Sequence, residues 1–108
     1  MLIKIIIVVW LHFIADFLFQ TTNIAMNKHH DSKILALHCL IYGAVMLVFG
    51  WQFALANGLT HFFIDYTTSR LTNQYWLKKN YRYFFGTIGL DQATHMTILI
   101  LTLNWLVL

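Results

Sequence analysis

The chain has 108 residues, of which 59% are hydrophobic and only 10% are charged, and it contains no proline. A soluble domain of this size needs more charged side chains to cover its surface, so this composition argues against one. The single cysteine, Cys39, excludes an intrachain disulfide framework and a thiolate-rich metal site. We therefore predict one transmembrane domain that covers residues 1–108.

The apolar stretches predict four transmembrane helices. Residues 2–20 are almost wholly apolar and long enough to cross a bilayer, and residues 21–33 form a polar loop. The apolar run over residues 34–66 is too long for one span, so we predict a hairpin with helices over residues 33–50 and 53–70, broken at Gly50 or at Asn57-Gly58. A fourth helix is predicted over residues 87–108. The predicted fold is an all-α, compact four-helix transmembrane bundle with a polar His/Asp core.

The basic residues indicate the orientation of this bundle. Lys28 and Lys33 lie in the first predicted loop, and Lys78, Lys79 and Arg82 lie between the third and fourth helices. By the positive-inside rule both loops are cytoplasmic, which makes this a multi-pass protein of the inner (cytoplasmic) membrane with both termini on the other side. The basic, aromatic residues 71–85 are expected to lie on anionic membrane lipid rather than on nucleic acid. A homo-oligomer is left open.

Three of the four Asp residues have a His four positions away, a spacing that places both side chains on one face of a helix. The pairs are His12/Asp16, His61/Asp65 and Asp91/His95, and His38 has Tyr42 at the same spacing. Counted inward from the predicted cytoplasmic ends, the four helices bring these residues to two matching depths. We therefore expect them to meet inside the bundle.

Imidazole and carboxylate groups without sulfur suit Zn first, with Mn or Fe as alternatives. The candidate metal ligands are His12, Asp16, His38, His61, Asp65, Asp91 and His95. They outnumber the ligands of a four-coordinate site, which favours two metals, or one metal with an acid/base network. Buried carboxylates at one depth repel one another, and a bound cation removes that repulsion. Two other interpretations stay open: hydrogen bonds that only hold the helices together, or a proton or ion pathway.

Four ordered motifs also carry a resemblance. They are His12-x3-Asp16-Phe17-x2-Gln20, Leu37-His38-x3-Tyr42, His61-x2-Ile64-Asp65 and Asp91-Gln92-x2-His95. Together they resemble the small bacterial and phage membrane proteins grouped as "domain of unknown function 3307", and the similarity runs over nearly the whole chain. This resemblance implies an architecture and a motif set but no reaction. More distantly, the motifs are similar to membrane-bound metal-dependent hydrolases, which implies metal-assisted hydrolysis.

The leading functional hypothesis is metal-dependent hydrolysis of a lipid-linked substrate near the cytoplasmic leaflet. Asp16, Asp65 and Asp91 are the candidate catalytic carboxylates. The candidate substrate-binding residues are Gln20, Tyr42, Lys78, Lys79 and Arg82. The alternatives are a proton- or ion-conducting membrane protein and a non-catalytic, phage-type membrane effector or subunit, so the sequence leaves open whether the protein is an enzyme.

Overall fold

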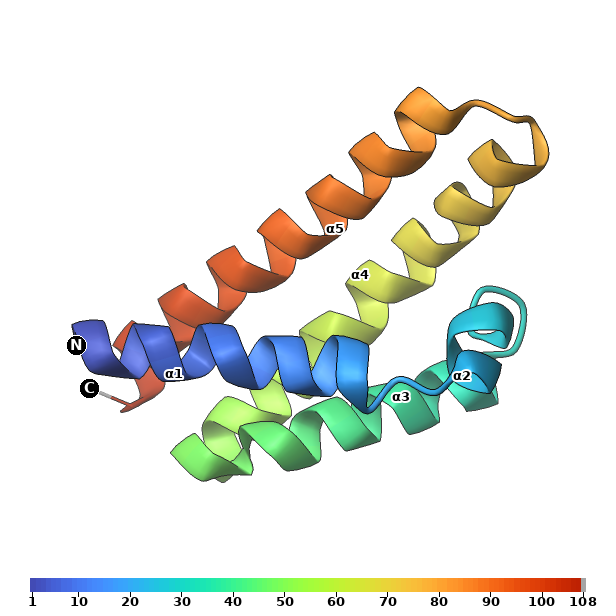
Figure 1. The fold of residues 1–108 in the computed structure, drawn as a ribbon. Coiled ribbons are helices and arrows are strands. Elements are labelled where there is room, and N and C mark those ends of the chain that lie inside the picture. The colour runs from blue at the N-terminus through green and yellow to red at the C-terminus, as the bar shows by residue number, and fades with distance from the viewer. Residues whose placement is uncertain (108) are drawn as a thin grey trace.

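The computed structural model describes residues 1–107, which form five α-helices (Figure 1). They are α1 (Leu2–Phe13), α2 (Thr22–Asn27), α3 (Ser32–Met46), α4 (Trp51–Leu77) and α5 (Tyr81–Thr102). π-helical turns over Ile14–Leu18 and Leu103–Val107 extend α1 and α5, and a 3₁₀ turn over Leu47–Phe49 follows α3.

Local sequence signals explain where the helices begin. The Thr21 hydroxyl accepts a hydrogen bond from the Ile24 N–H at the start of α2, and the Asp31 carboxylate accepts one from the Lys33 N–H at the start of α3. Such caps satisfy amide groups that have no partner inside the helix. The break between α3 and α4 lies at Gly50, whose φ of 105° is a conformation that favours glycine. Of the two breaks predicted, the chain uses this one.

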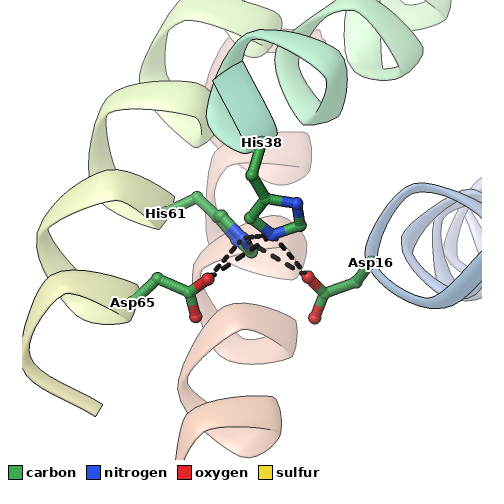
Figure 2. A group of neighbouring side chains, drawn as sticks. All are labelled: Asp16, His38, His61 and Asp65. Atoms are coloured by element: carbon green, nitrogen blue, oxygen red, sulfur yellow. Dashed lines mark hydrogen bonds and ion pairs between the residues drawn. The ribbon is translucent and has the colours of Figure 1, made fainter. Parts of the chain in front are cut away.

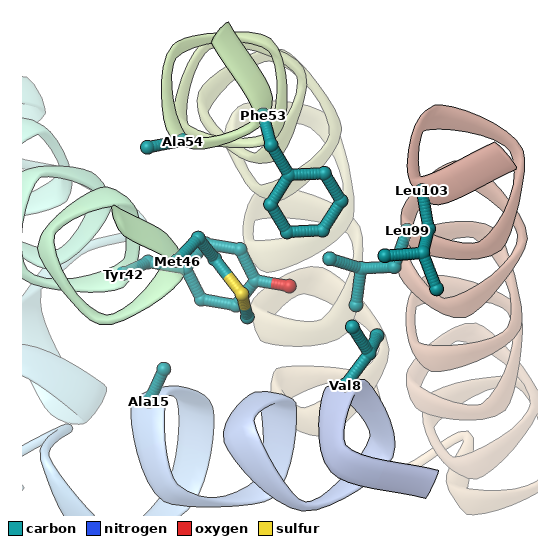
Figure 3. Packing of buried hydrophobic residues seen from close by; sticks show 8 residues of the cluster. All are labelled: Val8, Ala15, Tyr42, Met46, Phe53, Ala54, Leu99 and Leu103. Carbon is teal, nitrogen blue, oxygen red and sulfur yellow. The ribbon is translucent and has the colours of Figure 1, made fainter. Parts of the chain in front are cut away.

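Helices α4 and α5 form a long antiparallel hairpin, α1 and α3 pack on its lower half, and α2 packs on α3. In Figure 1, α3 runs beside the first half of α4, and α1 crosses in front of the hairpin. The apolar core lies between these four helices (Figure 3). Its buried members are Val8, Ala15, Tyr42, Met46, Phe53, Ala54, Leu99 and Leu103. This core supports one side of the polar cluster described below.

The structure does not support the predicted four-helix transmembrane bundle. Within residues 1–107 one stretch, Ser32–Phe49, is long and apolar enough to cross a membrane by length and composition, with a mean hydropathy of 1.9. The prediction was wrong because α4 and α5 carry the polar residues of the cluster, which lower the hydropathy of the helices that hold them. A multi-pass inner-membrane topology with both termini outside is therefore not supported either.

The helix boundaries also differ from the prediction. Helix α4 continues seven residues beyond Arg70 to Leu77, and α5 begins at Tyr81 instead of residue 87. Most of the basic, aromatic segment is therefore helical, and it forms the free end of the hairpin (Figure 1). The polar loop over residues 21–33 contains α2. The last residue of the predicted fourth helix lies outside the described residues.

Many large apolar side chains are exposed, most densely along α1. Leu2 is 70% exposed, Ile3 73% and Trp10 62%. Large exposed apolar patches are unusual in monomeric soluble proteins, where they commonly mark a surface for contact with lipid or with another protein. The high hydrophobic content of the sequence is therefore found partly on the surface and not only in the core.

Helices α3 and α4 lie close together at Gly43 and Gly58. A Cβ atom built on Gly58 would lie 3.7 Å from the Cys39 carbonyl oxygen and 3.8 Å from Gly43 Cα, which is ordinary van der Waals contact. There is room for a methyl group at this position, but a longer side chain would push the two helices apart.

We predict that Gly58→Ala raises the free energy of unfolding by about 0.5–1 kcal/mol, because Ala is a better helix former than Gly. Gly58→Leu should lower it by about 1–3 kcal/mol through overpacking. Gly89 in α5 has no neighbour within 4 Å of a built Cβ among the described residues, so Gly89→Leu is the matched control and should not destabilise. Chemical denaturation measures all three variants; equal effects of the two Leu substitutions would contradict the close approach.

Candidate metal centre

Four buried side chains from three segments converge on one point (Figure 2). Asp16 comes from the π-helical turn, His38 from α3, and His61 and Asp65 from α4. His38 Nε2 lies 3.0 Å from Asp16 Oδ1 and 3.4 Å from Asp65 Oδ2. His61 Nε2 lies 3.4 Å and 3.5 Å from the same two oxygens, and the two Nε2 atoms are 2.9 Å apart. We call these four residues the first ligand group.

The spacing of these donor atoms matches a tetrahedral metal site. Zinc bonds to nitrogen and oxygen of about 2.0–2.1 Å place neighbouring ligand atoms about 3.3 Å apart. The five donor–donor distances given above run from 2.9 to 3.5 Å. These side chains could therefore hold a divalent ion with little rearrangement.

Asp65 also belongs to a second group with Asp91 and His95 of α5. Its Oδ1 atom lies 3.5 Å from His95 Nε2, while its Oδ2 atom faces the first ligand group. His95 Nε2 is 3.1 Å from Asp91 Oδ1, which also accepts a hydrogen bond from the Thr68 hydroxyl at 2.6 Å. The Asp65 carboxylate is therefore shared by the two groups of potential ligands.

A chain of hydrogen bonds through Gln92 positions the carboxylates of Asp16 and Asp91. The Gln92 side-chain NH₂ donates to Asp16 Oδ2 at 2.9 Å and to Asp91 Oδ2 at 3.1 Å, which fixes its Oε1 atom as the acceptor facing His12 Nε2 at 2.7 Å. His12 Nε2 therefore carries the proton, and His12 Nδ1 accepts from the Tyr42 hydroxyl at 2.9 Å. His12 and Tyr42 act on Asp16 and Asp91 through Gln92.

Stacked rings orient the imidazoles. The Tyr42 and His61 rings lie 4.0 Å apart at 17°, and the His61 and His95 rings lie 4.0 Å apart at 25°. The Nδ1 atoms of His38 and His61 are buried without a hydrogen-bond partner among residues 1–107. Metal-binding imidazoles usually donate from the second nitrogen to an oxygen. Here the stacked rings take over that orienting role for His61, while His38 is oriented by its Nε2 contacts with the two carboxylates.

Lys28 provides the cation that the cluster needs in this structure. It follows α2, and its Nζ atom donates to Asp65 Oδ2 at 2.7 Å, with the two side chains 15% and 2% exposed. Asp16 and Asp91 are also buried, so three carboxylates face one ammonium group. The carboxylates outnumber this ammonium group, and imidazoles that carry a proton offset part of the remaining negative charge.

The pKa values follow from burial and from these contacts. Burial alone would raise the pKa of Asp16, but hydrogen bonds with His38 and His61 outweigh it and hold the pKa below its ordinary value. The pKa of Asp65 is lowered in the same way by His38, His61 and His95, with help from Lys28. Burial opposes protonation of His95, yet Asp65 and Asp91 raise its pKa to about 9. The carboxylates of Asp16 and Asp65 are therefore anionic at neutral pH and available to a cation.

A cleft of about 440 Å³ leads from the cluster to the protein surface. Asp16, Asp65 and Asp91 lie at its inner end, and Trp76, Phe84 and Ile88 lie where α4 and α5 extend beyond the other helices. The carboxylates are therefore buried but have an open path on one side.

The structure brings together six of the seven predicted metal ligands in the two groups. The seventh, His12, lies outside them, with its Nε2 atom 3.8 Å from Asp16 Oδ2. Of the predicted substrate-binding residues, Gln20 lines the cleft and Tyr42 packs behind the cluster. The remaining three, Lys78, Lys79 and Arg82, are exposed near the turn between α4 and α5, away from the cleft lining.

Sequence reasoning missed Lys28, Thr68 and Ser69 as site residues. Lys28 stands in a polar stretch beside other charged residues, and nothing in its spacing distinguishes it from Lys33. Thr68 and Ser69 do have a detectable signal, because they lie three and four residues after Asp65 and so share its helical face.

The fold and the cluster define a small all-α protein with buried His/Asp groups that could hold a metal ion. The profile of a protein family described as "Protein of unknown function (DUF3307)" matches residues 2–108. The chain belongs to this family, as its motifs predicted. No curated protein and no solved structure matches the chain.

The Lys28–Asp65 contact predicts a specific stability pattern in chelator-treated protein. Lys28→Met should lower the free energy of unfolding by about 3–5 kcal/mol, because it leaves the buried Asp65 carboxylate without its cation. The loss in the double variant Lys28→Met/Asp65→Asn should be smaller than the sum of the two single losses, because both substitutions remove the same contact. The exposed Lys33 gives a matched control, Lys33→Met, which should change stability by less than about 0.5 kcal/mol. Additive effects of Lys28→Met and Asp65→Asn would contradict the pairing.

Proposed function

We propose that the buried cluster binds a divalent metal ion, Zn before Mn or Fe, and that the protein is a metal-dependent hydrolase. The observation that carries this proposal is the set of 2.9–3.5 Å distances among His38 Nε2, His61 Nε2 and one oxygen each of Asp16 and Asp65. Hydrogen bonds alone would not need two imidazole nitrogens directed at each other and at two carboxylates.

In this proposal one ion occupies the first ligand group, and Asp91 with His95 forms an acid/base pair beside it. The charge supports a single ion, because Lys28 and a protonated His95 already offset part of the charge of the three carboxylates. Asp91 is the least buried of the three, with its side chain 12% exposed, and it lines the cleft. It is therefore the carboxylate best placed to meet a water molecule and a substrate.

The reaction that we propose is hydrolysis of an ester or a phosphate ester. A divalent ion held by these residues would supply Lewis-acid chemistry that lowers the pKa of a water molecule reaching it from the cleft, and Asp91 would be placed to accept the proton that this water loses. The oxygen of the water forms a bond to the carbonyl carbon or the phosphorus, and the bond to the leaving oxygen breaks. The leaving oxygen takes a proton, which in this proposal comes from His95, whose Nε2 atom lies 3.1 Å from Asp91 Oδ1.

The proposed substrate is lipid-linked, and the proposed location is a membrane surface. The exposed apolar side chains of α1 and the single stretch Ser32–Phe49 support lipid contact. The outer end of the cleft carries Trp76, Phe84 and Ile88, so an apolar substrate group would meet apolar side chains there.

Elemental analysis of purified protein tests the metal. We expect about one Zn, Mn or Fe per chain, lost in His61→Ala and Asp65→Asn because each removes a ligand of the first group. His12→Ala should keep the metal and lower its affinity by about 10–100-fold, as for residues that orient ligands. His30→Ala, at an exposed histidine, is the matched control. Metal retained in both ligand variants, or absent from wild-type protein reconstituted with each ion, would overturn the metal site.

Asp91→Asn separates metal binding from catalysis. It should retain the ion in the first ligand group but slow hydrolysis of a chromogenic phosphate or carboxylic ester by about 10²–10⁴-fold, the usual contribution of a general base. Parallel loss of metal and activity would instead identify Asp91 as a ligand. A metal-loaded wild-type protein without activity on either ester class would contradict the hydrolase.

A liposome flotation assay tests lipid contact. We expect wild-type protein to float with the vesicles, and a variant with Ile3→Ser and Trp10→Ser to float less, because both side chains are exposed apolar groups of α1. Lys33→Ser is a control at an exposed polar position. Wild-type protein that stays monomeric and does not float would contradict the membrane location.

A further inference from the structure

The cleft has a polar inner part and an apolar outer part, and the polar part contains more than the candidate metal ligands. Lys28 lines it, and so do Ser69 of α4 and Gln20. Ser69 is only 8% exposed, yet its hydroxyl has no hydrogen-bond partner among residues 1–107, and the same is true of Gln20 Oε1. A buried hydroxyl without a partner costs free energy unless a bound group satisfies it.

The outer part of the cleft offers flat apolar surface. The Trp76 and Phe84 rings lie 5.2 Å apart, centroid to centroid, on the facing walls that α4 and α5 provide. Trp76 is 54% exposed and Ile88 36%, so these side chains are open to a ligand. The two rings are in contact, so an alkyl chain that extends outward from the cluster would lie against their exposed faces.

Metal binding and the Lys28 contact compete for the same atom. Asp65 Oδ2 belongs to the first ligand group and is also the atom that Lys28 Nζ contacts at 2.7 Å. An ion in that group takes over Asp65, and the ammonium group of Lys28 becomes available to an anion in the cleft. The ion also removes the net negative charge that would otherwise repel an anion.

We infer that the cleft binds a phosphate ester of an alkyl chain, with its phosphate at Lys28 and Ser69 and its chain against Trp76 and Phe84. This inference rests on the proposed metal site and specifies its substrate class. It assigns phosphate recognition to Lys28 rather than to the exposed residues Lys78, Lys79 and Arg82. Phosphate binding thereby requires the ion, because only the ion separates Lys28 from Asp65.

Titration calorimetry with decyl phosphate tests this inference on protein whose metal content has been measured first and which carries Asp91→Asn throughout, so that hydrolysis does not consume the ligand during the titration. We expect binding to metal-loaded protein and none to chelator-treated protein. Lys28→Gln should weaken binding by about 10–100-fold, the usual range for a charge-assisted hydrogen bond. Lys78→Gln, at an exposed lysine of the turn, is the matched control and should leave binding unchanged.

Two further arms separate the parts of the ligand. Trp76→Ala should weaken the binding of decyl phosphate but not that of inorganic phosphate, which has no alkyl chain. Decyltrimethylammonium, which has the same chain with a cationic headgroup, should not bind. Inorganic phosphate that binds as tightly as decyl phosphate would overturn the role of the alkyl chain. Unchanged binding in Lys28→Gln, or an equal loss in Lys78→Gln, would overturn the role of Lys28.

Ser69→Ala tests phosphate binding a second time, because it removes a proposed phosphate contact without changing the charge. It decides the outcome if Lys28→Gln does not fold. Weaker binding of decyl phosphate in Ser69→Ala supports the inference, and unchanged binding contradicts it. If wild-type protein holds no metal, the proposed function fails. If metal is held but decyl phosphate does not bind, only this inference fails.

Discussion

The carboxylate of Asp65 is the group on which the structure depends most. It is 1% exposed and faces four potential cations: His38, His61, His95 and Lys28. These partners come from α3, α4, α5 and the residue after α2, so one side chain links most of the fold. A buried carboxylate without compensation costs several kcal/mol, on the order of the stability of a small domain. The helices must therefore keep its partners in place.

Helix packing meets this requirement through small residues and stacked rings. Gly43 and Gly58 allow α3 and α4 to approach closely, with their Cα atoms near each other. His38 lies a little over one turn before Gly43, and His61 lies three residues after Gly58, so the close approach brings the two imidazoles together. Tyr42 then packs flat against His61, and its hydroxyl reaches His12. Packing and polar contacts thus support one geometry.

Much of the cluster could be predicted from the sequence because its members repeat with helical spacing. The pairs at positions 12/16, 61/65 and 91/95 each lie on one helical face, and each pair reaches the cluster or its edge. Spacing within a helix does not determine which segment brings a long side chain from a loop, so Lys28 was missed. The cleft was also missed, because it depends on how far α4 and α5 extend beyond the other helices.

The transmembrane prediction failed for a reason that also explains the site. Among the described residues, ten buried residues are polar or charged and eleven are hydrophobic, while large apolar side chains occupy much of the surface. The hydrophobic residues that suggested four spans therefore lie largely on the surface, and the interior contains almost as many polar residues as hydrophobic ones. An interior this polar cannot be stabilised by apolar burial alone, so it depends on internal pairing. Three carboxylates outnumber the one lysine, and a divalent ion, which these His and Asp side chains could hold, would complete the pairing.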